Sequence, residues 1–158
     1  MFNLIIGRGI AMKQSIVIEA PIIEVFDCIA KANLREKWFP NVTSIHYSNL
    51  EHESHPGASF QLTAVEGKEQ VTLQGRNKEI TSPSFFAFEL ESQTYRMTFS
   101  YRLQQQANHT VIEQEFETKY YRPVMNVIDK LFKSSAKQTG EFVLNNLKEF
   151  CEARVRPE

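Results

Sequence analysis

A long amphipathic segment near the carboxyl end constrains the fold of this chain most strongly. From Pro123 to about Ala153, apolar residues recur at steps of three and four, which is the period of a helix and not of a strand. These residues are Val124, Val127, Ile128, Leu131, Phe132, Phe142, Val143, Leu147 and Phe150. At a rise of about 1.5 Å per residue, the helix would be roughly 45 Å long. An apolar stripe of that length needs a wide surface to lie on, so we expect the rest of the chain to supply one.

The centre of this stripe is polar, and two interpretations of it stay open. The helical register passes through Ser135, Gln138 and Thr139, with Gly140 beside them. Either the helix bows into solvent there, or its centre faces a cavity that holds something partly polar. Glycine in a helix interior costs about 1 kcal/mol relative to alanine, so Gly140 predicts a kink or a close approach by another part of the chain.

The segments between Pro40 and the long helix alternate apolar and polar residues with a period of two. Before them, a first strand is expected at Gln14 to Ala20, where three β-branched residues stand together, followed by a helix that Pro21 begins and a short helix from about Asn33 to Trp38. Further strands are expected near 42–48, 59–65, 70–80, 86–91, 95–104 and 110–120. Clean alternation is typical of an antiparallel sheet with one buried and one wet face. The sequence therefore predicts an α+β fold, in which a curved antiparallel sheet of about seven strands wraps around one long C-terminal helix.

Length and charge limit the partners of the chain. Its 158 residues suffice for one domain, expected over 12–158, and Met12 is a plausible natural start after a loose extension over residues 1–11. A net charge of -1 gives no electrostatic reason to expect nucleic acid, and no segment is long enough for stable membrane insertion. We see no secretory signal, so Cys28 and Cys151 are interpreted as reduced thiols of a cytoplasmic protein.

Several short motifs, taken in order, resemble the START-like (SRPBCC, or helix-grip) superfamily, and most of all its polyketide cyclase/dehydrase-like branch. The run Ile16–Phe26 resembles the family's opening strand, its Ala-Pro pair and its first helix, and Trp38–Val42 resembles the tryptophan-bearing second helix and the strand after it. Gly57 before a strand, Pro83 before an aromatic-rich strand and Leu147-Lys148 near the end of the last helix also fit. The resemblance covers roughly residues 12–153, and it is the order and spacing of the motifs that are specific.

The resemblance implies a hydrophobic cavity between the sheet and the long helix. Members of this superfamily bind lipids, quinones, sterols, polyketides or aromatic compounds, and a minority are cyclases, aromatases or hydrolases. A mostly apolar pocket with a few placed polar groups is the usual form of a small-molecule site. The candidate ligand-binding residues on the inward strand faces, the helix stripe and the mouth are Trp38, Phe39, Phe60, Leu62, Phe88, Met97, Phe99, Tyr101, Gln114, Phe116, Thr118, Ile128, Leu131, Ser135 and Thr139. The competing interpretation is that these aromatic side chains fill a solid core.

No motif in the sequence points to a metal, a cofactor or a catalytic group. His52 and His55, flanked by two glutamates, lie in a polar loop with no third ligand at a suitable spacing, so we expect no metal there. There is no Ser-His-Asp spacing, Cys-x-x-Cys or phosphate loop, and we expect no cofactor. Arg76 and Glu89 would pair across the sheet if their strands are neighbours.

Three functions remain open at this point. The first is binding of a small hydrophobic or amphipathic molecule in the cavity. The second is an enzyme of the cyclase, aromatase or dehydrase type, in which Tyr101, Gln114 or Thr139 would orient a substrate, since positioning alone can supply much of a rate enhancement. The third is a protein-interaction module that uses Lys130, Lys133 and Lys137 on the basic edge of the long helix.

Overall fold

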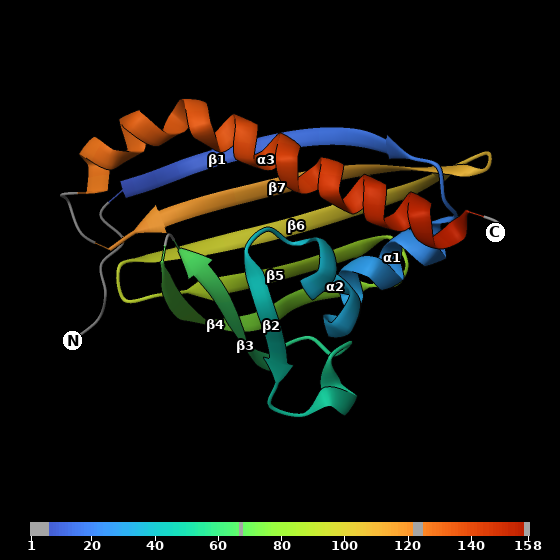
Figure 1. Ribbon diagram of the computed structural model, residues 1–158, viewed down its shortest axis with the longest axis horizontal. Coiled ribbons are helices and arrows are strands. Elements are labelled where there is room, and N and C mark those ends of the chain that lie inside the picture. Colours follow the sequence, from blue (N-terminus) through green and yellow to red (C-terminus); the bar gives the residue numbers. More distant parts are fainter. Residues whose placement is uncertain (1–6, 67, 122–124, 157–158) are drawn as a thin grey trace.

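A computed structural model shows one seven-stranded antiparallel sheet with three helices on its inner face (Figure 1). It describes residues 7–66, 68–121 and 125–156, and within them the side chains of all but 7–10, 66, 120 and 125–139. The elements are β1 (Gly7–Ile18), α1 (Ile22–Ala30), α2 (Ala32–Trp38), β2 (Val42–Tyr47), the short 3-10 helix η1 (Leu50–His52), β3 (Ser59–Glu66), β4 (Glu69–Thr81), β5 (Phe85–Glu91), β6 (Tyr95–Gln106), β7 (His109–Tyr120) and α3 (Met125–Val155). This is the predicted fold.

The sheet is a meander that closes back on its first strand. Its order is β1-β7-β6-β5-β4-β3-β2, so every neighbour except the β1–β7 pair is consecutive in the sequence. α3 runs along β1 and β7, and its C-terminal part also meets α1 and α2 (Figure 1). Among the described residues, no helix is both long enough and apolar enough to span a bilayer.

The first strand begins earlier than predicted, so the expectation of a loose segment is wrong for residues 7–11. Gly7 pairs with Tyr120 and Met12 pairs with Phe116, which gives the long strand β7 a backbone partner along its whole length. A register shift between Arg8 and Ala11 breaks the alternation of β1. The prediction rested on the β-branched run Ile16, Val17 and Ile18, which does not extend to these first residues.

A packed core fills one end of the inner face. α1 sets Val25, Phe26 and Ile29 against the sheet, and Phe26 meets the ring of Phe86 edge to face at 6.2 Å. The C-terminal part of α3 adds Leu147. The two cysteines, Cys28 on α1 and Cys151 on α3, are free and fully buried in this core.

A buried arginine lies at the centre of the core, and the sequence analysis did not predict it. Arg35 on α2 is fully buried, and its guanidinium donates to the Ile29 carbonyl at 2.8 Å and to the Tyr47 hydroxyl at 2.7 Å. Four aromatic rings lie within cation–π distance of it, those of Tyr47, Phe60, Phe86 and Phe88. None of these described partners is a carboxylate. Aromatic rings and neutral oxygen acceptors therefore stabilise the buried charge of Arg35.

The hydrogen bonds continue from Arg35 to the polar loop. The Tyr47 hydroxyl donates to Asn77 Oδ1 at 2.8 Å, and the amide of Asn77 donates to the carbonyls of Glu53 and His55 at 2.9 and 3.0 Å. Asn77 on β4 thus anchors the backbone of the loop that contains Glu53 and His55.

Glu89 on β5 faces away from Phe88 and Leu90 but is only 7% exposed to solvent. Its carboxylate pairs with Arg76 on β4 at 2.9 Å and with Lys78 at 3.6 Å. The predicted pairing of Arg76 with Glu89 is confirmed, and the flanking cations cover the carboxylate.

Gly75 on β4 lies under the ring of Phe60, and a side chain there would overlap the ring. Because Phe60 is itself buried, it has no room to retreat, and overpacking of this kind typically costs about 1–3 kcal/mol. We therefore expect Gly75→Ala to lower the free energy of unfolding, measured by urea denaturation, by about 1–3 kcal/mol. Leucine at position 60 removes the ring, so Gly75→Ala should cost less free energy of unfolding in the Phe60→Leu variant than in the natural protein. Additive losses would contradict the proposed overlap.

Candidate functional site: a cavity between sheet and helix

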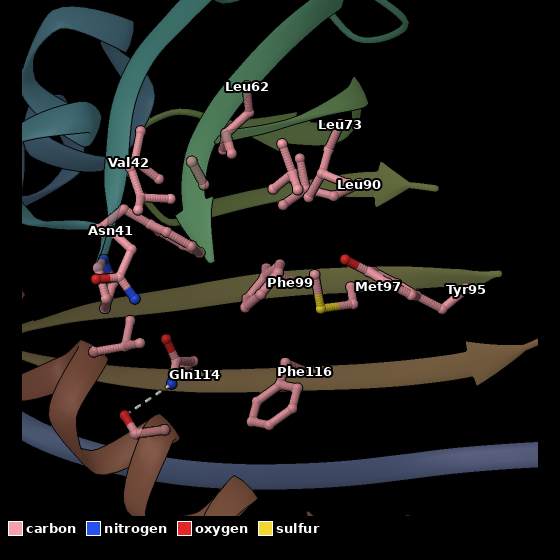
Figure 2. Close-up of a pocket in the computed structure, with 17 residues that line it drawn as sticks. Asn41, Val42, Leu62, Leu73, Leu90, Tyr95, Met97, Phe99, Gln114 and Phe116 are labelled. Atoms are coloured by element: carbon pink, nitrogen blue, oxygen red, sulfur yellow. Dashed lines mark hydrogen bonds between the residues drawn. The ribbon is translucent and has the colours of Figure 1, made fainter. Parts of the chain in front are cut away.

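A cavity of about 290 Å³ lies at the end of the inner face that the packed core leaves open (Figure 2). Its described lining residues are Phe39, Pro40, Asn41, Val42, Leu62, Ala64, Val65, Val71, Leu73, Leu90, Tyr95, Met97, Phe99, Gln114, Phe116, Gly140 and Val143. This volume suits a small organic molecule.

Strands β3 and β6 each contribute to the core with one part and to the cavity with the other. On β6, Tyr101 and Leu103 are core residues, whereas Tyr95, Met97 and Phe99 line the cavity. On β3, Phe60 belongs to the core, and Leu62 and Ala64 line the cavity. The boundary between the packed core and the cavity therefore crosses these strands. The alternation of inward and outward side chains continues unchanged across that boundary.

Aromatic rings form one wall of the cavity. Phe99 stacks on Phe116 with centroids 5.8 Å apart, and it meets Phe39 edge to face at 5.3 Å. On the core side Phe99 stacks on Phe88 at 5.2 Å. Figure 2 shows Leu62, Leu73 and Leu90 gathered across the cavity from Gln114 and Phe116.

A short polar chain borders this apolar space. The Tyr101 hydroxyl donates to Gln114 Oε1 at 2.6 Å. Gln114 Nε2 donates to the carbonyl of Gly140 on α3 at 3.3 Å, the dashed line in Figure 2. Gln114 is 1% exposed to solvent, and Tyr101 is fully buried. The chain thus joins β6, β7 and the long helix at the edge of the cavity.

At Gly140 the side chain of Gln14 on β1 lies close against the helix backbone. A side chain on Gly140 would overlap the side-chain amide of Gln14 on β1, so the predicted close approach is confirmed. The same residue lines the cavity and accepts the bond from Gln114. Glycine here lets the helix backbone form part of the cavity wall.

The cavity reaches the surface beside the start of β2. Of its lining residues, Asn41 and Val65 are exposed, and the Val65 N–H donates to the Asn41 carbonyl at 2.9 Å. Asn41 has a positive φ of 62°, which asparagine tolerates better than most residues. Three residues, Phe39, Pro40 and Asn41, thereby lead from α2 to the mouth.

The structure brings six of the candidate residues to the cavity, namely Phe39, Leu62, Met97, Phe99, Gln114 and Phe116. Phe60, Phe88 and Tyr101 lie in the packed core instead, and Thr118 is buried without being among the lining residues. Trp38 is also a core residue and not a cover for the mouth, because its indole donates to the Cys28 carbonyl at 2.8 Å. The candidates Ile128, Leu131, Ser135 and Thr139, and the three lysines of the helix edge, fall outside the described side chains.

Sequence reasoning missed the residues at the mouth and the hairpin end. The linker residues Pro40 and Asn41 carry no alternation, and Val65 and Val71 sit beside a turn. Leu73, Leu90 and Tyr95 share inward faces with residues that were named, so the strand pattern contained a signal for them.

The described residues show no metal-binding or acid–base cluster. The rings of His52 and His55 stack at 4.8 Å, but nowhere in the described part of the chain do three or more potential ligands converge. None of the described lining residues of the cavity is Asp, Glu, Lys, Arg or His.

Burial raises the pKa of Tyr101 far above its usual value, and the Arg35 charge opposes this only in part. Since the folded state holds this proton more tightly, the contribution to stability is complete below the unfolded pKa of about 10 and is lost as pH rises above it. We expect the free energy of unfolding to fall above that pH by up to about 1.4 kcal/mol per pH unit for this one proton. Tyr101→Phe should remove that part of the slope in urea titrations at alkaline pH, and an unchanged slope would contradict this assignment.

Comparison with known proteins places the chain in a family but does not identify a ligand. A family model described as polyketide cyclase/dehydrase and lipid transport matches residues 10–152. No curated protein matches the sequence.

Solved structures share the fold at low sequence identity. An aromatase/cyclase, Zhui, from Streptomyces sp. R1128 superposes with a TM-score of 0.74 at 14% identity, covering 92% of this chain and 95% of that one. A protein from Thermus thermophilus gives 0.74 at 14% identity, covering 92% and 99%, and Ara h 8.0201 gives 0.69 at 13%, covering 90% and 97%. The resemblance seen in the sequence is thus confirmed, and the chain belongs to the polyketide cyclase/dehydrase and lipid transport family.

Proposed function

We propose that the protein binds a small hydrophobic or amphipathic molecule in the cavity between its sheet and α3. The observation that carries the proposal is the lining itself: apolar and aromatic side chains surround the space, and one buried amide, that of Gln114, borders it. This is the usual composition of a site that takes its energy from apolar burial and its orientation from a single polar group. The six lining residues that the sequence also indicated are proposed as ligand contacts. We further propose a cytoplasmic location, which suits the two free thiols.

A cyclase-type enzyme is the second candidate, because the matching family model is described by that activity. Enzymes of this kind can act by folding a reactive chain against an apolar wall, which the stack of Phe99 on Phe116 would supply. The described lining offers no acid–base pair, so binding is the function that the geometry supports better. Turnover of a poly-β-ketone substrate, lost on a change at Gln114, would reverse this order.

Native mass spectrometry of the freshly purified protein, followed by solvent extraction, tests the binding proposal most directly. An adduct that solvent releases would support it and reveal the chemical class of the ligand.

A blocking substitution tests the location of the site. Ala64 lines the cavity from β3, so Ala64→Phe should fill part of the space with a ring. We expect the affinity for N-phenyl-1-naphthylamine, followed by its fluorescence, to fall at least about tenfold, a loss of about 1.4 kcal/mol. Ala153→Phe on the exposed side of α3 is the matched control and should bind like the natural protein. Equal affinities for the two variants, with both folded by circular dichroism, would place the probe elsewhere.

A further inference from the structure

The two cysteines of the chain lie on two helices that pack against each other. On α1, Val25, Cys28 and Ile29 are fully buried and share the inward face of the helix. On α3, Leu147 and Cys151 are fully buried one helical turn apart. Since α1 and the C-terminal part of α3 lie side by side, both helices turn a cysteine toward the interior that they share (Figure 1).

The two thiols are in direct contact. The Cys151 thiol donates a hydrogen bond to the sulfur of Cys28. A disulfide requires Cβ atoms about 3.5–4.5 Å apart, and a hydrogen bond between two thiols already brings their sulfur atoms together. The pair is therefore placed where a covalent bond between α1 and α3 could form.

Hydrogen bonds near the pair hold the helices in this arrangement. The Trp38 indole donates to the Cys28 carbonyl at 2.8 Å, and the Trp38 carbonyl accepts from Asn146 Nδ2 on α3 at 3.2 Å. Trp38 thus bridges α1 and α3. Close to the end of α3, Glu152 Oε2 accepts from the backbone N–H of Glu19 at 2.8 Å. The contact between the thiols therefore follows from how the backbone is held.

The surroundings make the two thiols unequal. The hydrogen bond from Cys151 lowers the pKa of Cys28; burial opposes this effect, and the charge of Arg154 supports it. The carboxylates of Glu24 and Asp27 on α1 also oppose it, as smaller contributions. The hydrogen bond that Cys151 donates, and then burial, raise the pKa of Cys151. Because the thiolate is the nucleophilic form, Cys28 is the more reactive of the two.

We propose that Cys28 and Cys151 form an oxidation site, at which hydrogen peroxide converts the two thiols into a disulfide between α1 and α3, with Cys28 reacting first. The Cys28 thiolate attacks one peroxide oxygen and the O–O bond breaks. The hydroxide that leaves takes up the proton released by Cys28, and Cys28 becomes a sulfenic acid. The Cys151 sulfur then attacks the Cys28 sulfur, so that the S–S bond forms and the S–O bond breaks. The hydroxyl group leaves as water with the proton of Cys151.

A small oxidant suits a pair that is fully buried. Cys151 lies close to the end of α3 at Val155, and brief openings of the last helical turn would admit a molecule as small as peroxide. Neither cysteine lines the cavity, so the oxidation site is separate from the proposed binding site. The two proposals can therefore fail independently.

Thiol counting on the natural protein tests the crosslink. The folded protein is treated with hydrogen peroxide, catalase removes the excess, and thiols are counted after denaturation. We expect both thiols to be lost together, the intact mass to fall by two hydrogen atoms, and the tryptic peptides 14–31 and 149–154 to be linked. Dithiothreitol should restore both thiols.

Three results of this experiment would overturn the proposal. The first is that both thiols persist under conditions that oxidise free glutathione. The second is an oxygen added to a cysteine without a link between the two peptides. The third is a link between two chains instead of within one.

Thermal unfolding shows whether the fold accommodates the bond. The disulfide closes a loop over most of the chain, and a long loop restricts the unfolded state most. We expect the melting temperature of the oxidised protein to exceed that of the reduced protein by roughly 5–15 °C. The double variant Cys28→Ser/Cys151→Ser is the matched control for methionine oxidation and should show no rise. No rise in the cross-linked natural protein, or an equal rise in the control, would overturn the proposal.

Single variants test which thiol reacts first. A lower pKa increases the thiolate fraction of Cys28 more than it decreases the nucleophilicity of its sulfur. Peroxide should therefore add oxygen to Cys28 in Cys151→Ser at least about threefold faster than to Cys151 in Cys28→Ser. Cys151→Ala and Cys28→Ala repeat the comparison without a new hydroxyl group. Equal rates in either folded pair would overturn the assignment of Cys28 as the first thiol to react.

Discussion

The inner face of the sheet is apolar from the packed core through to the cavity, and this continuous apolar face shapes the molecule. α1, α2 and the C-terminal part of α3 pack on the end of the sheet near Phe86 and Leu103. Toward the other end, strands β3 to β7 keep the same inward alternation without those helices to cover it. Large side chains close the first region, and the second retains a cavity. The packed core and the cavity therefore lie along one continuous inward face of the sheet.

The polar chain lies where these two regions meet. Gln114 follows the core residue Ile112 on β7 and precedes Phe116 in the cavity, each step being two residues along one face. A polar group at this depth requires partners, and it finds one on β6 and one in the backbone of α3. The same bonds that satisfy it also tie the helix to the sheet, so the side chain that borders the cavity also attaches the helix.

The architecture was predictable because it depends on periodicity, which the chain displays openly. Strands such as Tyr95–Gln106 show a period of two, and the long helix shows apolar steps of three and four. The division of each inward face into core and cavity was not predictable, since Phe99 and Tyr101 occupy equivalent positions in the alternation and differ only in what lies above them. The burial of Arg35 was missed for a related reason. An arginine on a short helix is normally expected to be exposed to solvent, and only the tertiary arrangement surrounds this one with aromatic rings.

The single tryptophan of the chain has a consequence for how the cavity can be observed. Trp38 is buried, its ring lies 5.6 Å from that of Phe39 in the cavity wall, and its edge-to-face partner Tyr101 holds the amide that borders the cavity. Its emission therefore originates from one defined place, which contacts the cavity wall directly at Phe39 and is linked to Gln114 through Tyr101. A ligand that reorients Phe39 or Tyr101 would shift the wavelength and the lifetime of Trp38 fluorescence. That fluorescence would then report whether the cavity is occupied.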